Sequence, residues 1–233
     1  MSFEKMVIIE GPRACFTRPE MKTERVTYDV PTPSALEGIL KGVYWKPAMR
    51  YVIDEIVVFN PIRTDSIMLN EVSIKSNING DPHVYASENR IMRNTMLLKN
   101  VKYGVKFHIK LTGIRCEREN KEVSNPLAKH YEMFDQRIRK GQTFKNLHLG
   151  LTEFPCSMHE VEHFDYDAVS IANAGTKDLG YMIYGLNYRN KGYPVNNDWD
   201  NPVFDETADP IYYHPFMVNG VINVAKYRET CVC

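Results

Sequence analysis

Apolar and polar positions alternate most regularly over residues 97–113. Val101, Tyr103, Val105, Phe107, Ile109 and Leu111 alternate there with Lys102, Lys106, His108 and Lys110. This period of two predicts a strand with one apolar face and one basic face. Residues 5–12 and 51–64 are rich in β-branched and aromatic side chains, which predicts two further strands.

Two segments show helical spacing instead. Thr32 followed by Pro33 is typical of a helix start, and Leu36, Ile39, Leu40 and Val43 then recur at helical intervals. A second helix is expected after Asn125-Pro126, with its apolar stripe formed by Leu127, Tyr131, Phe134 and Ile138. Gly141 stands where a left-handed C-terminal cap belongs.

The order of these elements predicts an α+β fold. With a last strand expected at residues 146–152, the order is strand–helix–strand–strand–helix–strand, the ferredoxin-like plan that RNA-recognition (RRM-like) domains use. We expect this domain at residues 1–154, with a β-hairpin or loop inserted at about residues 66–95 around the turn Asn79-Gly80-Asp81-Pro82. Residues 155–233 change to short strands with acidic turns, so a small antiparallel β-rich domain is expected there.

Charge divides the chain in the same way. The 233 residues have a formal net charge of zero, but residues 1–150 carry +7 and residues 151–233 carry −7. This asymmetry places a phosphate-binding face in the first part and leaves the acidic part for structure or for a protein neighbour, although a chance division of surface charge is the plain alternative. Five scattered cysteines without a C-x-x-C pair argue against a disulfide framework and a zinc ribbon. No apolar run approaches the roughly 20 residues of a membrane helix and no signal peptide is evident, so a cytoplasmic protein is expected.

Three stretches together resemble one protein family. Tyr28–Pro33 with Ala35–Ile39 leads into Val43-Tyr44-Trp45-Lys46-Pro47, Val52–Ile56 with Asn60-Pro61-Ile62 follows, and Lys129-His130-Tyr131 opens the second helix. Similar segments in this order typify the type I-C (Dvulg subtype) CRISPR repeat endoribonucleases of the RAMP superfamily. No single motif is specific, but the Tyr-Trp-Lys-Pro and Lys-His-Tyr pair at this separation is fairly so.

The resemblance implies an RNA-processing activity and its residues. In that family a tyrosine, a lysine and a histidine cleave precursor CRISPR RNA within its repeats without a metal or other cofactor, and the motifs carry these roles to Tyr44, Lys129 and His130. The family also stays bound to the 5′ handle of the product, as a subunit of the Cascade surveillance complex. We therefore expect repeat RNA and the other Cascade subunits as partners, no membrane, and a monomer when the chain is isolated.

The residue types suit this chemistry. Histidine transfers protons near neutral pH, lysine balances the charge of the phosphorane, and tyrosine usually orients a hydroxyl. We assign His130 as general acid or base, Lys129 as transition-state stabiliser and Tyr44 as aligner of the 2′-OH, with the roles of His130 and Tyr44 exchangeable. Each also has an ordinary interpretation: Tyr44 as core packing, His130 as a boundary histidine and Lys129 as a solvated charge.

Further cations are candidate RNA contacts. The basic run around Gly141, at the end of the second helix, and three residues nearer the N-terminus form this set, namely Arg13, Arg18, Lys46, Arg137, Arg139, Lys140 and Lys145. A solvated helix end favoured by the helix dipole is the alternative for the run around Gly141. The lysines of residues 102–110 are another candidate, and equally an ordinary wet sheet face.

Two other functions compete. His159-Glu160-Val161-Glu162-His163 fits the H-E-x-x-H zinc-hydrolase pattern, but that motif needs a helix, and a polar, acidic loop is the alternative interpretation of this segment. A subunit that only binds guide RNA would have almost the same sequence. The joint presence of Tyr44, Lys129 and His130 favours the nuclease.

Overall fold

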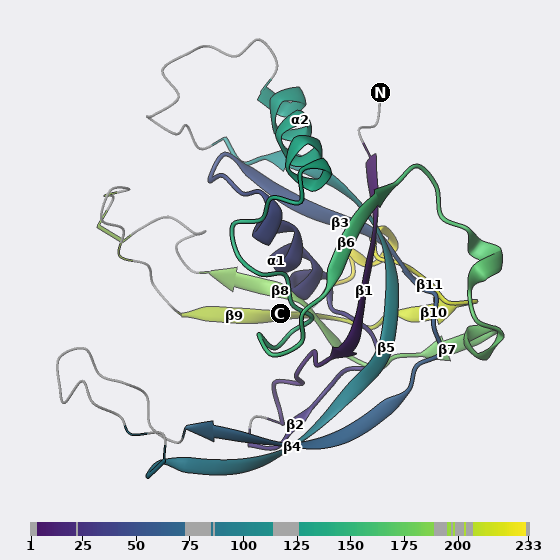
Figure 1. Cartoon of the computed structure of the whole chain (residues 1–233). Coiled ribbons are helices and arrows are strands. Elements are labelled where there is room, and N and C mark those ends of the chain that lie inside the picture. Colours follow the sequence, from purple (N-terminus) through teal and green to yellow (C-terminus); the bar gives the residue numbers. More distant parts are fainter. Residues whose placement is uncertain are drawn as a thin grey trace.

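The computed structural model describes most of the chain. Its described residues are 4–21, 23–72, 85, 87–113, 126–188, 195–196, 198, 203 and 207–231. The fold is mixed α and β, with a mostly antiparallel sheet and few helices (Figure 1). No helix among these residues is long and apolar enough to cross a membrane.

One large sheet organises the molecule. Its strand order is β6-β1-β5-β3-β11-β10-β7, and all neighbours along this path are antiparallel. The strands are β1 (Glu4–Ala14), β3 (Met49–Val58), β5 (Arg90–Leu111), β6 (Ser157–Val161), β7 (Thr176–Asp178), β10 (Phe216–Val218) and β11 (Val221–Asn223). The strands predicted over residues 5–12 and 97–113 correspond to β1 and β5.

Both predicted helices are present. The Thr32 hydroxyl accepts a hydrogen bond from the Ala35 amide at 3.2 Å and caps α1 (Pro33–Val43). The second helix is α2 (Pro126–Arg139). Gly141 follows it, and its φ of +62° is the left-handed conformation expected after the helix end. The Asn125 cap lies outside the described residues.

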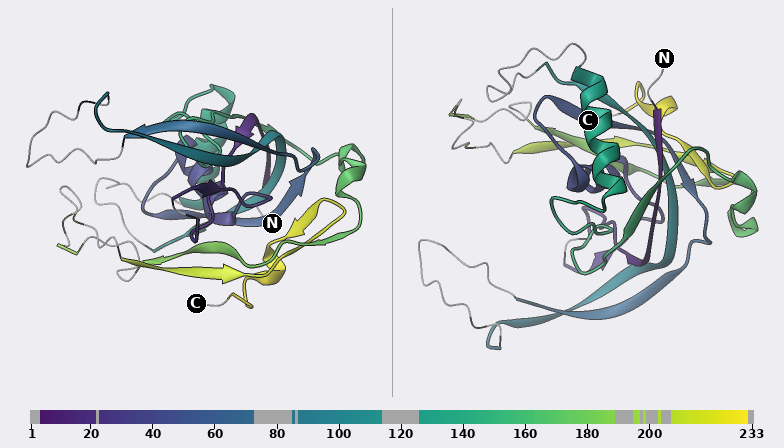
Figure 2. Two further views of the ribbon diagram at one scale, coloured as in Figure 1. Left: turned by 90° about the horizontal axis from the view of Figure 1, so that it is seen from below. Right: turned by 45° about the horizontal axis from the view of Figure 1, so that its top comes forward.

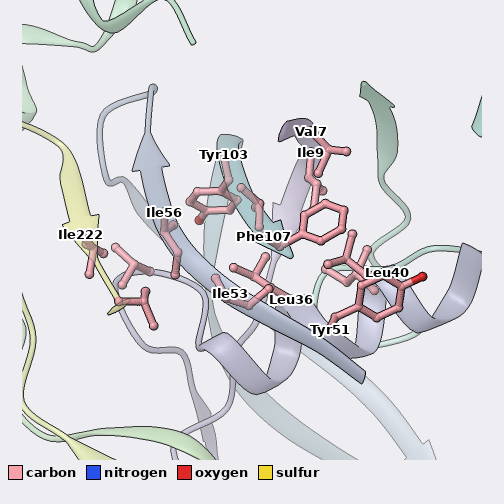
Figure 3. Close-up of a cluster of buried hydrophobic side chains, with 14 of the residues drawn as sticks. Val7, Ile9, Leu36, Leu40, Tyr51, Ile53, Ile56, Tyr103, Phe107 and Ile222 are labelled. Atoms are coloured by element: carbon pink, nitrogen blue, oxygen red, sulfur yellow. The ribbon is translucent and has the colours of Figure 1, made fainter. Parts of the chain in front are cut away.

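A core of apolar side chains joins the helices to the sheet. Leu36 and Leu40 of α1 point toward Ile53 of β3 and Phe107 of β5 (Figure 3). Tyr51, Phe107 and Phe134 pack edge to face, with ring centroids 5.3–5.7 Å apart. This aromatic cluster packs α2 against β3 and β5 through Phe134. It therefore fixes the place where the two helices meet.

A long curved arm leaves the sheet below the helices (Figure 1). It consists of β4 (Thr64–Val72), paired antiparallel with the first part of β5, while the short β2 (Arg25–Val26) pairs parallel with β5. The predicted hairpin at 66–95 overlaps this pair of strands. Its residues 73–84 and 86 lie outside the described part of the chain.

The part of the chain that follows α2 supplies short strands at both edges of the sheet. β6 pairs with β1, and β11 pairs with β3, so strands on both sides of residue 154 share one sheet. A separate hairpin of β8 (Met182–Tyr188) and β9 (Ala208–Tyr213) runs beneath α1, as two of the views show (Figures 1 and 2). The described residues also form short 3-10 turns: η1 (Tyr166–Ala168), η2 (Ile171–Asn173) and η3 (Ala225–Tyr227). The division into domains at 154/155 stays a prediction.

Two strand predictions need correction. The strand expected at 146–152 is wrong, because Gly150 takes a φ of +84° and the segment folds into a tight turn closed by the His148–Pro155 bridge. The strand that follows α2 is β6, at Ser157–Val161. The strand predicted over 51–64 ends at Val58 and resumes as β4 at Thr64, with Pro61, which has no N–H to pair, in the break.

Candidate active site

Tyr44 stands at the end of α1, where the helix turns into the strand that follows. Its amide donates to the Leu40 carbonyl at 3.2 Å as the helix ends, and its backbone is extended, with φ −150° and ψ 131°. The Tyr51 hydroxyl donates to the Tyr44 carbonyl at 2.6 Å. Helix end and strand therefore hold the Tyr44 backbone between them.

His130 comes from the second turn of α2 and meets the Tyr44 side chain. The Tyr44 hydroxyl and His130 Nδ1 are 2.9 Å apart, and the two rings are tilted by 41°. Both residues are buried, with 3% and 2% of their surfaces exposed. The hydrogen bond has two forms: the phenol donates to an unprotonated Nδ1, or a protonated Nδ1 donates to the phenol oxygen.

Lys129 precedes His130 on α2 and is half-buried. Successive helical residues are about 100° apart around the axis, so the two side chains leave α2 in different directions. Both lie within the first five residues of a 14-residue helix. The structure thus brings Tyr44 and His130 into contact and places Lys129 next to this pair along the chain.

Arg137 connects the two helices at the same point. Its guanidinium lies 5.2 Å from the centroid of the Tyr44 ring and donates to the Val43 carbonyl at 2.8 Å. That carbonyl belongs to the last turn of α1, where C=O groups lack helical partners. Arg137 was predicted as an RNA contact. In the structure its guanidinium packs on the Tyr44 ring and binds the Val43 carbonyl.

The basic segment after α2 crosses α1 beside the site. The Phe144 amide donates to the Gly42 carbonyl at 2.8 Å, and a Cβ on Gly42 would lie 2.8 Å from Leu147 Cδ2 and 3.6 Å from Lys145 Cε. Lys145 therefore lies against the helix only two residues from Tyr44. The Phe144 ring is 85% exposed.

The other predicted cations are spread over the surface. Arg139 and Lys140 are exposed at the end of α2, and Lys46 is exposed in the turn after Tyr44. Arg13 is exposed on β1, opposite Lys99 of β5. Arg18 lies over the Tyr28 ring at 4.6 Å, near Glu20. Arg13 and Arg18 therefore belong to the end of β1, not to the helix that carries the Tyr44–His130 pair.

Lys106, on the basic face of β5, is paired with an acid. Its ammonium group lies 2.7 Å from the Glu4 carboxylate. The hydrogen bond to Glu4, together with the negative charges of Glu55 and Asp54, raises the pKa of Lys106. His108 Nδ1 lies 2.7 Å from Asp54. Lys102 lies over the Phe59 ring at 5.7 Å. This pattern favours the ordinary sheet face over a track of free charges for phosphates.

An ion cluster holds α2 on the sheet. Lys5 of β1 reaches Asp135 of α2 at 2.8 Å and Glu160 of β6 at 2.6 Å. Burial by itself lowers the pKa of Lys5, but the hydrogen bonds to the two carboxylates outweigh this effect and the pKa is raised. The Ile109 amide also donates to the Tyr131 hydroxyl at 2.8 Å. The position of His130 depends on these contacts.

The H-E-x-x-H segment does not form the helix that a zinc hydrolase needs. His159 and Glu160 belong to β6, and an extended chain separates residues four apart by about 13 Å. The polar loop suggested as the alternative is also wrong for these residues, because they form an edge of the sheet. Within the described ranges, no three His, Cys, Asp or Glu side chains gather as metal ligands.

Sequence reasoning missed two residues that build this site. Tyr51 reads as one more apolar position of a strand, yet its hydroxyl holds the Tyr44 carbonyl. Gly42 reads as a weak point within α1, yet only a residue without Cβ lets Leu147 approach so closely. A glycine inside an otherwise regular helix is the one signal in the sequence for such a contact.

Comparison with known proteins gives consistent matches over the whole chain. A Cas5d family model, described as CRISPR-associated protein (Cas_Cas5), matches residues 7–225. A protein of Mannheimia succiniciproducens named CRISPR pre-crRNA endoribonuclease Cas5d is 34% identical over 234 residues, covering 94% of this chain and 93% of its own. A protein of the same name from Thermus thermophilus is 32% identical over 229 residues, covering 96% and 93%.

Solved structures agree with these matches. A crystal structure of a CRISPR-associated protein superposes with a TM-score of 0.63 at 25% identity, over 95% of this chain and 91% of its own. A functionally uncharacterized protein from Streptococcus mutans superposes with a TM-score of 0.62 at 27% identity, over the same shares. Sequence and fold therefore identify one family.

Proposed function

The chain belongs to the Cas5d family of CRISPR-associated proteins, and we propose that it is an endoribonuclease that cuts precursor CRISPR RNA within its repeats. Cleavage uses the ribose 2′-OH beside the scissile phosphate and needs no metal. The chain then stays on the 5′ handle of its product as a Cascade subunit. The contact between Tyr44 and His130 carries this proposal, because two residues 86 positions apart join their proton-transferring groups at 2.9 Å.

The fold supports this assignment at a finer level. The order β6-β1-β5-β3, with α1 and α2 between the strands in sequence, is the order of a ferredoxin-like sheet. We propose that this unit runs through β6, with the β4–β5 arm as its insertion and the later strands as a smaller β-rich part. The RNA-processing residues then lie where the two helices of the unit meet.

The Tyr44–His130 hydrogen bond can hold the ring for either proton transfer of the reaction. When a neutral ring donates from Nδ1 to the phenol oxygen, Nε2 presents a lone pair that takes the proton of the 2′-OH. When both ring nitrogens are protonated, Nδ1 still donates to the phenol oxygen and Nε2 gives its proton to the 5′-oxygen that leaves, so the ring returns to its neutral form. Tyr44 thus fixes the ring and selects its tautomer, whichever step His130 performs.

Lys129 supplies the charge that the phosphorane requires. A fixed cation near the developing negative charge stabilises the transition state more than the ground state. The beginning of α2 adds the positive end of the helix dipole. Lys129 and His130 lie in this part of the helix, so phosphate and proton donor would share one approach.

Burial sets a condition on this mechanism. Because Tyr44 and His130 expose only 3% and 2% of their surfaces, RNA binding must uncover the imidazole before it can reach a 2′-OH. The same burial favours the second candidate function, a subunit that binds CRISPR RNA and leaves cutting to another protein. A closed site of this kind is compatible with both.

The deciding experiment is incubation of the full chain with its own repeat RNA in EDTA. We expect one cut and a downstream product with a 5′-hydroxyl. His130→Ala abolishes the cut and weakens binding by less than about tenfold, because it removes proton transfer and little ground-state contact. Lys129→Ala and Tyr44→Phe slow the cut. Gln136→Ala, at an exposed position of the same helix, is the control for handling of the chain.

The outcomes separate the two candidates. RNA that stays intact but shifts in a gel supports the binding subunit. RNA with a 2′-deoxy residue at the cut must resist the wild-type chain, because the attacking hydroxyl is missing. Cleavage of that RNA at an undiminished rate contradicts the mechanism.

The remaining parts of the proposal concern partners and place. The acidic part of the chain, residues 151–233 at a formal charge of −7, faces protein neighbours in the complex, while the basic part, residues 1–150, binds RNA. The isolated chain is a monomer, and it works in the cytoplasm, where CRISPR RNA is made. Size-exclusion chromatography with light scattering, with and without repeat RNA, tests the monomer.

A further inference from the structure

A second feature lies on the opposite side of the Tyr44 backbone from His130. A groove of about 720 Å³ opens between α1, the first half of β3 and β8. Figure 1 shows β8 running beneath α1, which gives this groove its two sides. Its lining includes Lys41 of α1, Trp45 of the turn before β3, Arg50 and Tyr51 of β3, and Leu186 and Tyr188 of β8.

The groove and the candidate active site share one stretch of backbone. Tyr44 is extended, and successive side chains of an extended chain point to opposite sides. The Tyr44 ring therefore enters the core toward His130, while Trp45 lines the groove. Tyr51 also lines the groove and donates to the Tyr44 carbonyl. A ligand in the groove would lie one backbone away from the proposed catalytic pair.

The side chains in the groove fit nucleotides. Trp45 is 48% exposed and Tyr188 is 44% exposed, so both rings are open to a ligand in the groove that they line. Lys41 and Arg50 add two cations, and among the described lining residues the one acid is Glu37, which lies 3.0 Å from Lys41. Exposed rings between cations are the combination that stacks bases and tracks a single-stranded backbone.

We propose that this groove binds the single-stranded repeat RNA that adjoins the cut, with a base stacked on Trp45 and phosphate beside Arg50. The inference rests on the proposed function, because it takes the RNA from that reaction. It adds a binding site that holds the strand in register while the scissile phosphate lies on the other side of Tyr44. Trp45 and Arg50 are thus positioning residues for the cut.

A peptide is the competing occupant. Among the described residues β8 pairs only with β9, so its other edge offers backbone groups to an extended segment of a protein neighbour. The net positive charge of the lining and the exposed rings favour RNA. The experiment below makes the peptide one of its outcomes.

The test measures binding of the full chain to two RNAs that carry a 2′-deoxy residue at the cut and so stay intact. One is the complete repeat, and the other lacks the single-stranded nucleotides beside the cut. We expect Trp45→Ala to weaken binding of the complete repeat by about 5- to 100-fold, the cost of losing one stacked base, and to leave the trimmed RNA unaffected. Trp45→Phe restores most of the loss. Arg50→Ala weakens the binding of the complete repeat and lowers the salt dependence of that binding.

Tyr181→Ala is the matched control, because Tyr181 is an exposed aromatic residue outside the groove. Equal affinity of wild type and Trp45→Ala for the complete repeat overturns the inference. So does an equal loss for both RNAs, because the effect would then not depend on the single strand. Normal RNA binding by Trp45→Ala, with loss of assembly with the other Cascade subunits, assigns the groove to a peptide and also overturns it.

Cleavage is scored separately with the ordinary repeat in EDTA. A wild-type chain that fails to cut but binds the complete repeat through Trp45 sinks the nuclease proposal and keeps the groove. A chain that cuts normally with Trp45→Ala at wild-type affinity keeps the nuclease and sinks the groove.

Discussion

The Arg137 guanidinium packs 5.2 Å from the centroid of the Tyr44 ring and donates to the carbonyl of Val43, the residue before Tyr44. One side chain of α2 therefore holds both the backbone and the ring at the end of α1. We therefore propose that Arg137 acts on cleavage through Tyr44, as a positioning residue. Its removal changes where the phenol points.

Replacement of Arg137 by methionine should reduce the rate of cleavage more than it reduces RNA affinity. The loss of a cation–π contact and a hydrogen bond to the helix end amounts to about 1–2 kcal/mol, or roughly 5- to 30-fold. Single-turnover cleavage gives the rate, and titration of uncleavable RNA gives the affinity. An Arg137 that bound phosphate directly would instead lose affinity and salt dependence together. Gln136→Met, at the neighbouring exposed position of α2, is the control.

Tyr51→Phe should destabilise the chain and slow cleavage together. It removes the hydroxyl that donates to the buried Tyr44 carbonyl at 2.6 Å. Burial raises the pKa of Tyr51 far above its usual value, so the phenol remains a neutral donor at any working pH. We expect a loss of about 1–2 kcal/mol in the free energy of unfolding, measured in urea. Tyr166→Phe, whose hydroxyl bonds Glu55 at the surface, should change it by much less.

The contacts around Tyr44 show what the sequence can and cannot predict. Caps and periodicity place α1 and α2 correctly, because Thr32 and Gly141 act on their own local backbone. The strand at 146–152 fails for the opposite reason. Its apolar alternation is genuine, but the turn at Gly150 packs so tightly that a Cβ there would lie 1.8 Å from the Cys15 carbonyl oxygen, and only tertiary structure determines that contact.

The candidate site shows the same difference between what local sequence predicts and what only the fold determines. Motif resemblance finds Tyr44, Lys129 and His130, but residue types alone do not reveal that the first and last meet. Arg137 has the charge of an RNA contact and is used on Tyr44. Lys106 belongs to a basic strand face and is paired with Glu4. Charge read from a sequence says what a side chain can bind, while the fold decides whether it is already bound.

Lys5→Met should destabilise the chain by about 1 kcal/mol at neutral pH, because Lys5 joins Asp135 of α2 to Glu160 of β6. The folded chain raises the pKa of Lys5, so this stabilisation is complete below the unfolded pKa of about 10.4. It is lost as the pH rises through the raised value in the folded state. Urea unfolding of wild type and variant should therefore differ at pH 7 and converge in strong alkali.

Lys177→Met is the control for this effect. Lys177 pairs with Asp29 at 2.6 Å, but both side chains are more exposed than those around Lys5, and the pair does not involve α2. Its replacement should change the free energy of unfolding by less than Lys5→Met and leave cleavage unchanged. A larger effect of Lys177→Met would mean that Lys5 does not fix α2.

Gly42→Ala should impair cleavage without unfolding α1. The added methyl group would lie 2.8 Å from Leu147 Cδ2, so the Leu147 side chain must shift, which weakens its packing of the segment that carries Lys145 against the helix. Alanine favours a helix interior by about 1 kcal/mol over glycine, so the helix itself gains while the contact is lost. We expect a weaker affinity for repeat RNA at a nearly unchanged unfolding midpoint. Gly38→Ala is the control, because a Cβ at Gly38 has open space around it.

His130 should resist chemical modification in the free chain. With 2% of its surface exposed and Nδ1 engaged by Tyr44, its imidazole is closed to a reagent such as diethyl pyrocarbonate, whereas His163 is exposed. Peptide mapping by mass spectrometry should find His130 modified at least about tenfold more slowly, because reaction requires local opening. Tyr44→Ala removes the partner and opens a cavity beside the ring, so His130 should then react faster while the rate at His163 stays the same. Equal rates at both histidines in the wild-type chain would mean that the site is already open, and that RNA binding need not uncover the proton donor.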